Sequence, residues 1–171
     1  MTGTVTGVHE PTSGLGGRSI QVPASPPASS ENAKKVMLAN SSGDTAPELA
    51  LRSALHRAGF RYFTHRRPVK GLRCTADLIF PRRRVCVFVD GCFWHGCEAH
   101  RRVPVANAGY WGPKIARNVE RDRRNNALLG EMGWTVVRIW EHEPVEEAVA
   151  RVADALGVGP RRATAPGGVG R

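Results

Sequence analysis

Two apolar runs separated by four residues constrain the fold of this chain more than any other feature. Residues 74–80 read CTADLIF and residues 85–90 read VCVFVD, with PRRR between them. Runs of this length and composition predict strands, and so short a connection predicts a hairpin. The four-residue loop sets Asp77 opposite Phe88. Because side chains alternate along a strand, Asp77 then lies on the same sheet face as Asp90.

Periodic patterns around the hairpin predict two helices and a third strand. Thr45, with Glu48 three residues later, fits a capping box at the start of a helix that ends near Gly59. A second helix is expected from about 114 to 131, followed by a strand over 134–140. The order of helix, hairpin, irregular loop, helix and strand predicts a small α/β domain around a mixed sheet.

The acidic residues have two interpretations each. An acid inside an apolar strand is costly unless something pairs with it. Asp77 can pair with a nearby arginine, in which case Asp90 simply ends its strand. Alternatively, the two carboxylates are close enough to share a Mg²⁺ ion, since this cation prefers oxygen ligands. Glu48 is likewise either a helix cap without chemistry or an active-site residue.

A dense cluster of metal-ligating residues follows the second strand in DGCFWHGCEAH, and WEHE adds His142 after the third strand. Structural zinc takes four such ligands, so one of the five candidates is left over. His95 is the one expected to turn away, towards Asp90. The alternative is a set of unliganded thiols and surface histidines. The expected zinc ligands are Cys92, Cys97, His100 and His142.

The chain is strongly basic, with 25 Lys and Arg against 15 Asp and Glu and a net charge of +10. Most of the excess lies in the predicted folded part, which favours a shaped surface for an acidic polymer such as nucleic acid. A second basic group is expected to bracket Asp77: Arg66, Arg67, Lys70, Arg73 and Arg82 to Arg84. Those of the 114–126 helix either hold phosphates or form an ordinary solvated face. The cations of that helix expected to contact DNA are Lys114, Arg117 and Arg121.

Paired aromatics occur in two glycine-flanked segments that are expected to be exposed loops, Phe93-Trp94 and Tyr110-Trp111. Such rings either form a lid on the core or, beside a basic surface, wedge between bases. No apolar run reaches the length of a membrane span, and the N-terminal residues lack the order of a signal peptide. Cysteines close to histidines also favour a metal site in a reducing compartment, so an intracellular protein is expected.

Four segments resemble the very-short-patch repair (Vsr) endonucleases, which are strand-specific nickases acting at T:G mismatches: DTAPE, ADLIFPRRRVCVFVDGCFWHGC, YWGPKIARNVERDRRN and GWTVVRIWEHE. The resemblance implies an α/β, restriction-endonuclease-like (PD-(D/E)XK) core with a mixed central sheet, flanking helices and a structural zinc site. It implies an endonuclease domain over 31–156, in which 31–46 form a DNA-contacting arm. Residues 1–30 are expected to be a disordered extension and 157–171 a flexible tail.

The resemblance also implies a role for each candidate site residue. Asp77 and the main-chain carbonyl of Val89 are implied to hold a catalytic Mg²⁺, with His95 as general base and Glu48 supporting the site. Family members can carry histidine at the position of Asp90, so this acid either ligates metal or orients water. The zinc ligands implied are the four named above. The residues implied to enter the duplex are Phe93, Trp94, Trp111 and Met37.

The function implied is Mg²⁺-dependent nicking of double-stranded DNA at T:G mismatches that arise when 5-methylcytosine deaminates. A cytosine-5 DNA methyltransferase is then the expected functional companion, and a monomer in the bacterial cytoplasm, associated with the nucleoid, is the expected form. Two alternatives stay open. One is a related nickase or a restriction or defence endonuclease with a different recognition signal, and the other is a zinc-stapled DNA-binding module without catalysis.

Overall fold

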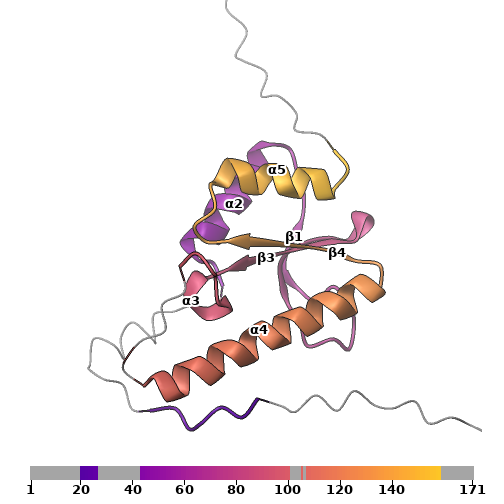
Figure 1. The fold of residues 1–171 in the computed structure, drawn as a ribbon. Helices are drawn as coiled ribbons and strands as arrows, with labels where there is room; N and C mark the ends of the chain where they lie inside the picture. The colour runs from indigo at the N-terminus through magenta and orange to yellow at the C-terminus, as the bar shows by residue number, and fades with distance from the viewer. Residues whose placement is uncertain (1–19, 27–42, 101–104, 106, 159–171) are drawn as a thin grey trace, which may run out of the picture.

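A mixed four-stranded sheet forms the centre of the computed structural model, which describes residues 20–26, 43–100, 105 and 107–158 (Figure 1). The strands follow one another in chain order across the sheet. The first three are antiparallel, and the last runs parallel to the third. This confirms the α/β class with a mixed sheet. The strands are β1 (Phe63–Arg66), β2 (Ala76–Phe80), β3 (Val85–Asp90) and β4 (Thr135–Trp140).

The β2–β3 hairpin has the register expected from its loop length. Phe80 pairs with Val85 and Leu78 with Val87, across a short 3-10 turn, η1 (Pro81–Arg83). Arg84 closes that turn in the left-handed region, with φ of 50°. The register therefore puts the side chains of Asp77 and Asp90 on one face of the sheet, as predicted.

Two helices cover one face of the sheet and a long helix crosses the other (Figure 1). On the first face, leucines of α2 (Ala46–Arg57) and Val152 of α5 (Val145–Ala155) pack on Leu78 and Val87 in a fully apolar core. On the second face, Leu129 of α4 (Ala108–Glu131) packs with Cys86 and Phe88. Cys74 and Cys86 are buried there, as expected of small apolar residues.

Several local predictions are wrong in detail. Helix α4 begins at Ala108, so Tyr110 and Trp111 lie on a helix and not in an exposed loop. Pro113 lies inside the helix, where it cannot donate the usual backbone hydrogen bond, and the helix continues around it with the Tyr110 side chain buried. Phe93 and Trp94 likewise lie half-buried on a short helix, α3 (Cys92–His95).

Two elements were not predicted, β1 and α5. Strand β1 is short and mostly exposed, so it lacks an apolar pattern. Helix α5 carries a readable signal, with Pro144 before it, acids in its first turn, and Ala148 and Val152 buried one turn apart. The predictions for Met37, for residues 1–19 and for residues 159–171 fall outside the described residues. None of the described helices is long and apolar enough to cross a membrane.

Candidate active site

A cleft of about 680 Å³ opens on the α4 side of the sheet, where β3 ends. Residues from α2, β2, β3, α3, α4 and β4 line it, so the site is assembled from most of the described fold. The four residues predicted as catalytic all line this cleft. They are Asp77, His95, Asp90 and Glu48.

Asp77 lies near the start of β2, where the Val89 backbone N–H donates a hydrogen bond of 2.7 Å to its Oδ2 atom. Burial raises the pKa of Asp77 to about 6, and the negative charges of Glu48 and Asp90 add to that rise. Among the described residues, Asp77 forms no ion pair with an arginine, so the alternative in which it pairs with one is wrong. A buried carboxyl group whose ionised form is disfavoured gains from a bound cation, and Asp77 therefore fits a Mg²⁺ ligand chemically.

Glu48 is 2% exposed and anchored from several sides. It accepts a hydrogen bond of 2.9 Å from the Asp44 backbone N–H, where the capping-box prediction expected Thr45 as the donor. Arg52 Nη1 lies 3.4 Å from its Oε1 atom, and His65 Nε2 lies 3.2 Å from the same oxygen. The sequence interpretation missed His65, which comes from the unpredicted strand β1. Glu48 is thus a fixed buried acid whose charge reaches Asp77.

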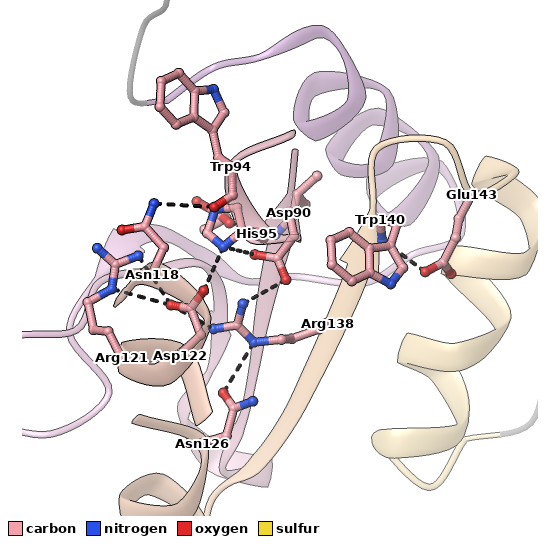
Figure 2. Close-up of polar contacts among 12 residues, drawn as sticks. Asp90, Trp94, His95, Asn118, Arg121, Asp122, Asn126, Arg138, Trp140 and Glu143 are labelled. Carbon is pink, nitrogen blue, oxygen red and sulfur yellow. Dashed lines mark hydrogen bonds and ion pairs between the residues drawn. The ribbon is translucent and has the colours of Figure 1, made fainter. Parts of the chain in front are cut away.

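His95 turns away from the Cys/His cluster, as predicted, and contacts two carboxylates (Figure 2). Its Nδ1 atom lies 2.6 Å from Asp122 Oδ2 and 3.4 Å from Asp90 Oδ1. A carboxylate at 2.6 Å from Nδ1 fixes the proton on that nitrogen, so Nε2 keeps its lone pair. An imidazole held in this way by an acid has the arrangement of a general base.

Asp122 was not predicted to be part of the site. Its sequence context, ERDRR, suggests a solvated helix face, yet its side chain is largely buried on the inner side of α4. Burial acts to raise the pKa of Asp122, but the His95 hydrogen bond and the charge of Arg138 outweigh it and lower the pKa below the ordinary value. Asp122 is therefore a stably ionised partner for His95.

Arg138, from the middle of β4, also reaches the cleft without having been predicted. Its Nη1 atom donates a hydrogen bond of 2.7 Å to Oδ2 of Asp90, which is 3% exposed (Figure 2). Its Nη2 atom lies 3.4 Å from Asp122 Oδ1. Asp90 therefore does more than end its strand, because it forms a buried ion pair with the neighbouring strand.

The predicted zinc ligands converge at one end of the sheet. Ligand atoms of Cys92, Cys97, His100 and His142 all lie within 4.8 Å of one another. The sulfur-to-nitrogen distances run from 3.0 to 3.9 Å, and tetrahedral zinc with ordinary bond lengths requires about 3.5 Å. Burial raises the pKa of Cys92, with the Cys97 thiol adding to the rise. Donor type and spacing thus fit a structural zinc ion.

Glu141 connects this Cys/His cluster to the cleft. Its Oε1 atom accepts a hydrogen bond of 2.7 Å from the Cys92 backbone N–H, which fixes the first residue of α3 to the end of β4. The sequence interpretation missed this contact, although Glu141 directly precedes the predicted ligand His142. Helix α3 is therefore held at its first residue by Glu141 and at its last residue, His95, by Asp122.

The predicted wedge aromatics form a single group beside the cleft. Ring centroids of Phe93, Trp94 and Trp111 lie 5.0 to 5.7 Å apart in edge-to-face contacts. The Lys114 ammonium lies 5.4 Å from the Trp111 ring centroid and 5.7 Å from that of Trp94. The rings therefore form a compact and half-buried group, in contrast to the exposed loops expected.

The three cations of α4 that are predicted to contact DNA lie on one side of that helix. Lys114, Arg117 and Arg121 are three and then four residues apart, which places them on neighbouring turns, and Arg121 lines the cleft. Arg73 lines it too. Residues 82–84 lie in the hairpin turn and do not line the cleft, so the expectation that they bracket Asp77 is wrong.

Comparison with known proteins gives consistent matches. A family model described as "DNA mismatch endonuclease Vsr" matches residues 28–101. The chain is 50% identical over 122 residues to the type II nicking enzyme V.NaeI of Lentzea aerocolonigenes, covering 70% of this chain and 74% of that protein. It is 36% identical over 108 residues to the DNA mismatch endonuclease Vsr of Escherichia coli K12, covering 63% of this chain and 67% of that one. Among solved structures, the catalytic domain of the homing endonuclease I-Bth0305I matches with a TM-score of 0.46 and 20% identity, over 66% of this chain and 94% of that one.

Proposed function

Because the chain belongs to the Vsr family of DNA mismatch endonucleases, we propose that it nicks one strand of double-stranded DNA at a T:G mismatch. Such mismatches arise when 5-methylcytosine deaminates. The observation that carries the proposal is the His95–Asp122 pair, which lies in the same cleft as the buried carboxyl group of Asp77. The relative named a type II nicking enzyme supports nicking, and the relative named a mismatch endonuclease supports the mismatch as signal.

Hydrolysis of a phosphodiester needs an activated water and a way to neutralise charge on the phosphate and the leaving oxygen. His95 Nε2 takes the proton from water, while Asp122 at Nδ1 stabilises the imidazolium that results. Asp77 and the Val89 carbonyl are the proposed ligands of Mg²⁺, with Glu48 and Asp90 close by. When bound there, Mg²⁺ supplies Lewis-acid polarisation of the phosphate and charge stabilisation of the leaving oxygen.

Access to the mismatch is assigned to the aromatic group and the basic side of α4. Phe93, Trp94 and Trp111 are proposed to insert beside the mismatched pair, which partly unstacks the duplex. Lys114, Arg117 and Arg121 are proposed to hold the phosphates on either side. The compact packing of the rings supports this, since a rigid wedge loses little conformational freedom on insertion. Met37 is proposed to contact the same site from the N-terminal arm.

The proposal extends to the framework of the site. The mixed sheet, with an acid on the central hairpin, supports a restriction-endonuclease-like (PD-(D/E)XK) core. The Cys/His cluster is proposed to bind zinc and to hold α3, which carries His95, against the end of β4. A cytosine-5 DNA methyltransferase is the proposed functional companion, because its product is the base whose deamination creates the substrate. The enzyme is proposed to act as a monomer at the bacterial nucleoid.

A panel of strand-labelled duplexes tests the proposal. The same sequence is prepared with a T:G pair, a T:A pair, an unmodified C:G pair and a methylated C:G pair, each incubated with Mg²⁺. We expect a single nick in the strand that carries the mismatched T and no cleavage of the other three duplexes. A nick in paired or methylated DNA would instead identify a nickase with a different signal. Binding without cleavage of any duplex would identify a non-catalytic DNA-binding module.

A further inference from the structure

Arg138 connects three elements around the site through one guanidinium group (Figure 2). Nη1 contacts Asp90 at the end of β3, and Nη2 contacts Asp122 on α4. Nε donates a hydrogen bond of 3.2 Å to Asn126 Oδ1, one turn further along α4. The guanidinium carbon lies 5.0 Å from the centroid of the Phe88 ring. The group is therefore fixed on the sheet side and on the helix side at once.

These contacts close a ring of four polar side chains, Arg138, Asp90, His95 and Asp122. His95 Nδ1 faces Asp122 and Asp90, and Arg138 faces the same two carboxylates from the other side. The carboxylates are nearly inaccessible, with side-chain exposures of 4% and 12%. Two buried carboxylates next to one imidazole repel each other unless a cation lies between them, and Arg138 supplies that cation. Arg121 also contacts Asp122, but its side chain is 56% exposed, so solvent screens it.

The carboxylates of Asp90 and Asp77 have different bonding partners. Asp90 Oδ2 is bound by Arg138, and Asp90 Oδ1 faces His95. Asp77 accepts a hydrogen bond from a backbone N–H and forms no ion pair with an arginine among the described residues. A metal ion bound to Asp90 would have to displace the Arg138 guanidinium from this carboxylate. The guanidinium would then be buried beside a second cation, which is unfavourable.

We propose that Arg138 is a positioning residue for the nicking reaction, and that Asp90 is its counter-ion and not a ligand of the catalytic metal. This inference rests on the proposed function and adds the role of the arginine to it. Arg138 holds Asp90 and Asp122 at a separation at which both face His95 Nδ1. The imidazole is thereby oriented with Nε2 towards the cleft. A lysine cannot replace this role fully, because an ammonium group lacks the planar fork that spans two carboxylates and an amide.

Four variants separate this role from metal binding: Arg138→Met, Arg138→Lys, Asp90→Asn and the double variant Asp90→Asn/Arg138→Met. For Arg138→Met we expect kcat to fall about 10²-fold, with KM for DNA and the half-saturating Mg²⁺ concentration unchanged, because His95 is misplaced while Asp77 is untouched. Arg138→Lys should recover part of this loss. The double variant, which removes both charges, should be at least about tenfold faster than Arg138→Met alone.

Two results would overturn the proposal. One is a tenfold or larger increase in the half-saturating Mg²⁺ concentration for Asp90→Asn, which would make Asp90 a metal ligand. The other is a double variant no faster than Arg138→Met. Comparison of Arg138→Lys and the double variant keeps the test decisive even if Arg138→Met folds poorly, since neither leaves two uncompensated carboxylates.

An NMR measurement at a fixed pH gives a readout that does not depend on nicking. The side-chain N–H signals of ¹⁵N-labelled histidine are recorded, and His95 is assigned by the signal lost in His95→Gln. We expect a downfield, slowly exchanging Nδ1–H proton in the wild type and the double variant, and its loss or shift in Arg138→Met. An unchanged signal in Arg138→Met would contradict the positioning role. If these signals behave as expected but the wild type cleaves no T:G duplex, the proposed function fails and the role of Arg138 in orienting His95 stands.

Discussion

The Cys/His cluster and the cleft share the segment from Asp90 to Cys97, but the chain assembles them in different ways. Three of the four cluster residues come from one short segment, 92–100, and β4 leads to the fourth, His142. The cleft draws its residues from six helices and strands, spread from α2 to β4 along the sequence. The cluster is thus a local loop closed at one point, whereas the cleft depends on the packing of α4 against the sheet.

The two regions also differ in how their polar groups are satisfied. In the cleft, the Arg138 guanidinium compensates the carboxylates of Asp90 and Asp122, and Asp77 is the acid whose burial raises its pKa, to about 6. In the cluster, burial and a neighbouring thiol raise the pKa of Cys92, so thiolates need a cation to form. This difference fits the proposed roles of the two metals, with zinc supporting the structure in the cluster and Mg²⁺ the chemistry in the cleft.

The variant Asp77→Asn tests most directly whether the chemistry of the cleft is separate from the structural role of the cluster. We expect nicking to fall by at least about 10³-fold, because the proposed Mg²⁺ loses its side-chain ligand. Bound zinc should stay unchanged because the cluster is intact, and the thermal midpoint should not fall, because the substitution removes a carboxylate whose ionised form is disfavoured by burial. Single-turnover nicking and elemental analysis measure the two quantities. Asp154→Asn, an exposed acid on α5, is the matched control. Wild-type nicking by Asp77→Asn would remove this residue from the reaction.

The converse variant is Cys97→Ser, which targets the cluster and leaves the cleft carboxylates in place. We expect zinc binding to be lost, the thermal midpoint to fall, and nicking to drop about 10²-fold because α3 no longer fixes His95. Cys86→Ser removes a buried thiol outside the cluster and should retain zinc. A zinc-free Cys97→Ser enzyme with full activity would show that the cluster does not position the base.

The same contrast explains which parts of the site could be predicted from the sequence. The Cys/His cluster is visible as a local density of ligands, and the side shared by Asp77 and Asp90 follows from the length of one loop. Asp122 and His65 have ordinary local explanations, a solvated helix face and an exposed strand. Their roles depend on contacts between distant segments, which local patterns do not encode.

Arg138 is an intermediate case. It is a lone cation in the apolar strand WTVVRIW, and the parallel pairing places it beside Phe88, one alternation before Asp90. A cation at an inward-facing strand position requires a partner, so the pattern predicts a buried ion pair once the pairing of β3 with β4 is known. The first turns of α4 were missed because they contain two glycines and a proline, and the burial of Tyr110 that accompanies them depends on the fold.

A smaller effect is expected at the boundary of the two regions, where the aromatic group lies. Trp111→Ala should weaken binding of a T:G duplex about tenfold and of a T:A duplex less, because stacking is proposed at the mismatch. Fluorescence anisotropy without Mg²⁺ measures both affinities. Phe63→Ala, an aromatic on β1 that is 49% exposed, should change neither. Equal losses for the two duplexes with Trp111→Ala would place the ring outside mismatch recognition.

The smallest effect is expected from Arg117→Ala, which tests whether the cations of α4 act from one side. Arg117 is exposed and lies on the side of the helix that carries Lys114 and Arg121. Its loss should weaken T:G and T:A duplexes equally, by a few-fold, and reduce the slope of log affinity against log salt by about 1, because one phosphate contact disappears. Arg123 is also exposed, but the helical period places it on the opposite side, so Arg123→Ala should leave the salt slope unchanged. Equal salt slopes for the two variants would mean that Arg117 makes no specific phosphate contact. The cations of α4 would then attract DNA only through their summed charge.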